Sequence, residues 1–118
     1  MAYEHINLAF LEEFAKGDSK RMKRYINMFL QSAPGGIESM RTHYASQDWE
    51  QLKSAAHSLK PQVGYMGIAS LKEIIPRLEE YAREQKNLEQ VPQLIDEVES
   101  ICTNAFEELR QAVQGMAD

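Results

Sequence analysis

The chain has 118 residues, enough for one hydrophobic core but too few for a separate catalytic domain beside it. A hydrophobic fraction of 43% and a charged fraction of 26% are typical of a folded globular protein. The net charge of -5 disfavours a nucleic-acid partner, and a single cysteine cannot form a disulfide scaffold. No apolar run approaches the roughly 20 residues that a membrane span needs, which disfavours a transmembrane protein. We therefore predict one cytoplasmic domain over residues 1–118.

Helical periodicity runs through nearly the whole chain, and strand-like alternation is absent. A short first helix is predicted over residues 7–16, with Gly17 as its terminator. Its candidate apolar face consists of Leu8, Leu11 and Phe14, with Phe10 beside them. Asp18 then stands where it can cap the next helix.

The second helix carries a long amphipathic stripe with steps of three or four residues, formed by Met22, Ile26, Phe29, Ala33, Ile37, Met40 and Tyr44. The stripe keeps its phase through Ala33-Pro34-Gly35-Gly36, whereas a break into two helices would usually reset the phase. The sequence therefore favours one long helix kinked at Pro34 over two shorter helices.

Three further amphipathic helices follow. Asp48, with Gln51 three residues later, resembles a capping box and opens a third helix that Gly67 closes. A fourth helix reaches about Glu84, and Pro92 suits the first turn of the last one. The predicted fold is therefore all-α, an antiparallel four-helix bundle with a short additional N-terminal helix.

One of the three histidines, His57, has informative neighbours. On the third helix it points away from the apolar stripe and toward water, and its own side of the helix carries Lys53, Ser54, Lys60 and Gly64. A phosphoryl group moving to an imidazole needs a lone pair on one nitrogen, open approach and nearby positive charge. Lys60 can place its ammonium beside such a phosphate, and Gly64 leaves room for another protein. Phosphoryl transfer is therefore favoured over the ordinary interpretation of a solvated surface histidine.

The segment His57-Ser58-Leu59-Lys60, followed by Gly64 and Gly67, resembles the motif H-x-L-K-G-x-x-G-x-x-G of the histidine-containing phosphotransfer (Hpt) domain family. The histidine, the leucine, the lysine and the last two glycines match. Pro61 stands where the family usually has glycine, and it cannot donate a hydrogen bond to the carbonyl of His57. The helix order and the length are also similar to the family over essentially the entire chain.

The resemblance implies that the ring nitrogen of His57 remote from the backbone takes the phosphoryl group, while a polar side chain on the following helix holds the other nitrogen. Glu79 lies 22 residues after His57, a spacing at which several family members carry Glu or Gln. It is therefore the candidate for orienting the imidazole and fixing its tautomer. The alternative interpretation is that Glu79 and Glu80 are simply solvated.

The expected function is that of a phosphorelay carrier, which takes a phosphoryl group from the aspartate of a response-regulator receiver domain and passes it to another receiver. The resemblance implies that the receiver supplies an acidic pocket and Mg²⁺, and that a hybrid histidine kinase can be among the partners. This chain, as a monomer, would supply the imidazole and a docking surface made of Lys53, Ser54, Gly64, Tyr65 and Ile68.

Other chemistry lacks its signatures. No glycine-rich phosphate cradle precedes a helix, so the chain is predicted to have no ATP site and not to be an enzyme in its own right. No Glu-x-x-His pairs are present for a metal centre in the bundle. Two other hypotheses stay open: the phosphoacceptor module of a histidine kinase, phosphorylated by a separate ATP-binding domain, and a helical adaptor that binds its partner without any phosphate.

Overall fold

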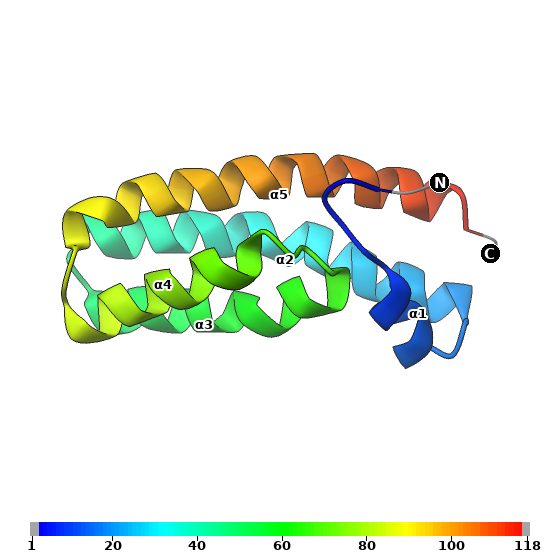
Figure 1. Ribbon diagram of the computed structural model, residues 1–118, viewed down its shortest axis with the longest axis horizontal. Coiled ribbons are helices and arrows are strands. Elements are labelled where there is room, and N and C mark those ends of the chain that lie inside the picture. The colour runs from blue at the N-terminus through cyan, green and yellow to red at the C-terminus, as the bar shows by residue number, and fades with distance from the viewer. Residues whose placement is uncertain (1–2, 117–118) are drawn as a thin grey trace.

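The computed structural model describes residues 3–116, and within that range all regular elements are helices. Their bounds are α1 Ala9–Phe14, α2 Ser19–Ala45, α3 Trp49–Met66, α4 Leu71–Glu84, the short 3-10 helix η1 Leu88–Gln90 and α5 Val91–Gln114. Successive long helices run in opposite directions, and α1 lies at the end of the bundle where α2 begins (Figure 1). The prediction of an all-α antiparallel four-helix bundle with a short N-terminal helix is confirmed.

The second helix is continuous over 27 residues and passes through Pro34 without a break. Ala33 and Ile37 are buried, whereas Pro34 faces solvent. The backbone carbonyl that loses its donor to the proline can therefore be hydrated. The prediction of one long helix, rather than two shorter ones, is confirmed.

Local signals in the sequence set the ends of these helices. Asp18 accepts hydrogen bonds from the backbone N–H groups of Lys20 and Arg21, at 3.0 and 3.3 Å, and Asp48 accepts one from Gln51 at 3.2 Å. Such caps satisfy N–H groups that have no partner within the helix. The first turns of α2 and α3 are thus fixed by the residues that the sequence points to.

The core is built from the apolar stripes of the four long helices, and no polar or charged residue among residues 3–116 is fully buried. Cys102 on α5 belongs to this core, and burial raises the pKa of its thiol to about 12. The thiol is therefore protonated near neutral pH and serves packing. No helix within residues 3–116 is both long enough and apolar enough to cross a membrane.

The first helix is shorter than predicted, and its apolar face is different. Leu11 is fully buried and Leu8 partly buried, but Phe10 and Phe14 are 54% and 46% exposed, so the predicted apolar face of Leu8, Leu11 and Phe14 is not buried as a whole. The two exposed phenylalanine rings instead join an aromatic cluster with two partly buried tyrosines, defined as Phe10, Phe14, Tyr25 and Tyr65, whose contacting ring centroids lie 5.2–6.4 Å apart. This cluster covers the junction of α1, α2 and α3.

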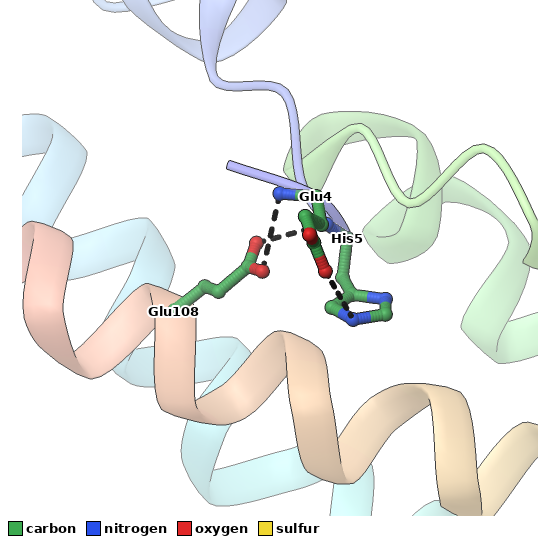
Figure 2. A group of neighbouring side chains, drawn as sticks. All are labelled: Glu4, His5 and Glu108. Atoms are coloured by element: carbon green, nitrogen blue, oxygen red, sulfur yellow. Dashed lines mark hydrogen bonds and ion pairs between the residues drawn. The ribbon is translucent and has the colours of Figure 1, made fainter. Parts of the chain in front are cut away.

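An N-terminal segment, residues 3–8, crosses the bundle before α1 begins (Figure 1). The Glu108 carboxylate on α5 accepts hydrogen bonds from the backbone N–H groups of Glu4 and His5, at 3.2 and 2.9 Å (Figure 2). The N–H of Asn7 donates to the carbonyl of Met66 at the end of α3, at 3.2 Å. The segment also buries its own Ile6, and it thereby ties α5 to α3 and holds α1 in place.

Gly67 makes this crossing possible. It closes α3 in the left-handed conformation, with φ of 64°, while the N–H of Ile68 donates to the carbonyl of Val63 at 3.2 Å. A Cβ atom on Gly67 would overlap the backbone carbonyl of Asn7. A glycine is therefore required here by both the backbone conformation and the contact with the N-terminal segment.

Candidate functional site

His57 lies on α3 with its side chain 68% exposed. Its neighbours Ala56 and Leu59 are buried against the rest of the bundle, so the apolar stripe anchors the helix while the imidazole stands outside it. The structure thus presents the ring to solvent, as the helical periodicity predicts. Pro61, one turn later, is accommodated on the exposed side of an uninterrupted α3.

Glu79 on α4 reaches across to His57. Its Oε2 lies 2.7 Å from Nδ1 of the imidazole, and its other oxygen, Oε1, accepts a hydrogen bond from the Lys60 ammonium at 2.8 Å. The side chain of Glu79 is only 13% exposed. The structure therefore joins His57, Lys60 and Glu79 in one hydrogen-bonded group, and the alternative that Glu79 is merely solvated does not describe it.

The charge of Glu79 decides how the ring is held. The hydrogen bond from Lys60 is the main cause that lowers the pKa of Glu79; burial opposes it, and the hydrogen bond with His57 lowers the pKa further. An ionised carboxylate can only accept hydrogen bonds. In a neutral imidazole paired with it, Nδ1 therefore carries the proton and Nε2 the lone pair.

The lowered pKa of Glu79 leads to a prediction about stability. A carboxyl group whose pKa in the folded state lies below its ordinary value, here 4.5, contributes stability above that value and loses it as the pH falls through the lowered pKa. We expect the difference in free energy of unfolding between the wild-type protein and Glu79→Gln to be smaller at about pH 3 than at about pH 7. Urea unfolding at both pH values measures it.

The neighbouring Glu80→Gln is the matched control, because that carboxylate lies 3.7 Å from the Lys86 ammonium and takes no part in the group around His57. Its effect should be small at both pH values, as is usual for exposed ion pairs. The ionised carboxylate would have no stabilising role if the difference in free energy of unfolding between the wild-type protein and Glu79→Gln stayed constant or grew as the pH fell.

A shallow cavity of about 540 Å³ opens around His57 and is lined by Lys53, Ser54, His57, Ser58, Glu79 and Arg83. Lys53 and Ser54 thus lie beside the imidazole, as predicted from the helix. Arg83 was not predicted. It lies one helical turn after Glu79, and that i+4 spacing is the signal that could have placed it on the same side of α4.

A second cavity, of about 430 Å³, lies farther along α3 and is lined by Phe10, Pro61, Gly64, Tyr65 and Lys72. A Cβ atom added to Gly64 would meet no atom within 4 Å, so nothing in this protein's own packing requires glycine there. Gly64 and Tyr65 are thus partly exposed on α3, about two turns beyond His57, whereas Ile68 is fully buried. Ile68 has no exposed surface for a partner to contact, so the prediction that it belongs to the docking surface was wrong.

Comparison with known proteins gives the family. A family model described as the Hpt domain matches residues 24–117. The chain belongs to the Hpt domain family. The match includes all of α3 and α4, which carry His57 and Glu79, and leaves α1 outside. As an Hpt domain the chain is a phosphotransfer domain, and Hpt domains interact with receiver domains.

A crystal structure of histidine-containing phosphotransfer protein B (HptB) from Pseudomonas aeruginosa PAO1 is similar to this Hpt domain, with a TM-score of 0.86 and 22% sequence identity. The similarity covers 96% of this chain and 97% of that chain. At this identity it shows the shared helical fold. A search among curated proteins found no significant match.

Proposed function

We propose that this Hpt domain is a phosphorelay carrier in which His57 accepts a phosphoryl group from the aspartate of one receiver domain and passes it to the aspartate of another. The observation that carries the proposal is an exposed imidazole whose Nδ1 lies 2.7 Å from a largely buried carboxylate. This pairing favours the tautomer with its lone pair on Nε2, the nitrogen that a partner can reach.

In the transfer step the Nε2 lone pair forms an N–P bond as the P–O bond to the receiver aspartate breaks, and the aspartate leaves as a carboxylate. The imidazole keeps its proton on Nδ1, and Glu79 stabilises the positive charge that develops on the ring. The ammonium of Lys60 supplies positive charge near the phosphoryl oxygens. The receiver provides the acidic pocket and Mg²⁺, so this chain contributes mainly positioning.

The proposed docking surface surrounds His57 and comprises Lys53, Ser54, Gly64 and Tyr65. Its far side continues into the aromatic cluster, because Tyr65 contacts the rings of both Phe10 and Phe14. Exposed apolar side chains that gather in one patch can mark an interaction site. A receiver seated over His57 would bury Tyr65 and the neighbouring rings.

Gly64 provides a direct test of this surface. Gly64→Gln should stabilise α3 by about 1 kcal/mol through helix propensity. It should nevertheless weaken receiver binding by about 10-fold or more, because the new side chain occupies space left for the partner. Thermal unfolding and titration with a receiver measure the two effects.

Gly35→Gln is the matched control, since a Cβ atom at Gly35 in α2 also meets nothing within 4 Å and Gly35 lines neither cavity near His57. It should show the gain in stability without the loss of binding. Equal receiver affinity for the two glutamine variants would remove Gly64 from the docking surface.

The function itself is tested by mixing the protein with a receiver domain that carries a labelled phosphoryl group. We expect the label on this chain in an acid-labile, alkali-stable linkage, as for phosphohistidine, followed by its passage to a second receiver. Label acquired only from a histidine-kinase ATP-binding domain with ATP would favour the kinase-module hypothesis instead. Receiver binding without label from any donor would favour the phosphate-free adaptor.

A further inference from the structure

We propose that Glu4, His5 and Glu108 form a binding site for a divalent transition-metal ion, with Zn²⁺ as the ion that fits them best. Each side chain offers one ligand atom, and these three atoms all lie within 4.8 Å of one another (Figure 2). The site lies where the N-terminal segment meets α5. None of the three residues lines the cavity around His57, so the proposal goes beyond phosphotransfer and does not depend on it.

Glu108 is the fixed member of the group. It is partly buried on α5, and its two carboxylate oxygens accept hydrogen bonds from the backbone N–H groups of Glu4 and His5, one oxygen for each. Each oxygen of an ionised carboxylate can accept more than one bond, so coordination of an ion does not require these hydrogen bonds to break. Hydrogen bonds to a ligand also orient it, as they do around known metal sites. The carboxylate is therefore held in place before an ion arrives.

The side chains of His5 and Glu4 complete the group from the N-terminal segment. Nε2 of His5 lies 3.8 Å from Oε2 of Glu4. Around a tetrahedral ion with bonds of about 2.0–2.2 Å, neighbouring ligand atoms lie about 3.3–3.6 Å apart. The imidazole is 31% exposed and the Glu4 side chain 87% exposed, so rotation of these two side chains can bring the ligand atoms to that spacing.

The set of ligand atoms decides which ion fits. One imidazole nitrogen with two carboxylate oxygens suits Zn²⁺, whereas Ca²⁺ and Mg²⁺ prefer oxygen ligands alone. In their ionised form the two carboxylates supply two negative charges, which balance those of a divalent ion. Three protein ligands leave a fourth position of the tetrahedron for water, and the exposure of Glu4 keeps that position open to solvent.

A bound ion would fasten the N-terminal segment to the bundle. The segment is held to α5 by the hydrogen bonds to Glu108, and to α3 by the hydrogen bond from Asn7 to Met66. An ion that binds only when Glu4 and His5 lie against Glu108 stabilises that closed arrangement by mass action. Because the segment leads directly into α1, the ion would also make the opening of that helix rarer.

The experiment titrates ZnCl₂ into the untagged full chain, after treatment with a chelator, and follows binding by calorimetry. We expect one equivalent to bind, and Glu4→Gln and His5→Gln each to weaken that binding by about 10-fold or more. Both variants keep the backbone N–H groups that hold the segment on Glu108, so their fold should be unchanged. Hydrogen exchange should show that Zn²⁺ protects the amides of residues 4–7 in the wild type but not in Glu4→Gln.

His57→Gln is the matched control, because that imidazole also lies beside a carboxylate, 2.7 Å from Glu79, and could hold an ion itself. This variant should bind Zn²⁺ with wild-type affinity and show the same protection of residues 4–7. Loss of the binding in His57→Gln would place the ion at the proposed phosphoacceptor and overturn the proposal. Equal affinities of the wild type, Glu4→Gln and His5→Gln, or no saturable binding at all, would overturn it as well.

Discussion

The His57→Gln variant is expected to lose phosphoryl acceptance, with transfer from a labelled receiver at least about 1,000-fold slower than for the wild type. Glutamine has a similar reach but no nucleophilic nitrogen. The fold should survive, because the replaced side chain is largely exposed and such changes usually alter stability by about 1 kcal/mol or less. Label transfer, together with thermal unfolding of the same sample, measures both effects.

His43→Gln is the control for this experiment. His43 lies near the end of α2, is partly buried and lies outside the hydrogen-bonded group formed by His57, Lys60 and Glu79. It should accept label at close to the wild-type rate. Label on His57→Gln at a comparable rate would exclude His57 as the acceptor and leave the family assignment without its proposed site.

The Gly67→Ala variant is expected to lose about 3 kcal/mol of stability or more. A left-handed conformation costs a non-glycine residue about 1–2 kcal/mol. The added Cβ atom would also overlap the carbonyl of Asn7 and displace the N-terminal segment. That displacement breaks the hydrogen bond from Asn7 to Met66, worth about 1 kcal/mol, and exposes Ile6. Urea unfolding measures the total.

Gly17→Ala separates the two contributions. Gly17 also has a positive φ, of 73°, but a Cβ atom there would meet nothing within 4 Å. It should therefore show the conformational cost alone, about 1 kcal/mol. Equal losses in the two alanine variants would mean that the contact between Gly67 and Asn7 contributes nothing to stability.

The long helices could be predicted because each carries its own periodic stripe and its own end signals. The phase of the stripe through Pro34 correctly indicated a single α2, and Asp18, Asp48 and Gly67 stand at the ends where the sequence placed them. The first helix was harder, because six residues give too little periodicity to define a face. Phe14 was therefore placed on one apolar face with Leu8 and Leu11, although it packs in a partly exposed aromatic cluster.

The site was predictable where it depends on one helix and less so where it depends on two. The exposure of His57, and the positions of Lys60 and Gly64 beside it, follow from the spacing along α3. The contact with Glu79 was expected from its spacing in a known family, not from physical principles. The engagement of Lys60 by Glu79 depends on how α3 and α4 pack, and the sequence alone does not specify such a contact.

The N-terminal segment joins parts of the chain that are far apart in sequence, since Glu108 holds the backbone of Glu4 and His5 from 104 and 103 residues away. Bringing the N-terminal segment to Glu108 closes a loop of about a hundred residues, which is entropically unfavourable until the long helices between them have packed together. The segment and α1 should thus be late to assemble and early to open, with weak protection of their amides from hydrogen exchange. The imidazole of His57 lies on α3 and is held by Glu79 from α4. It would therefore keep its orientation while the N-terminal segment and α1 open.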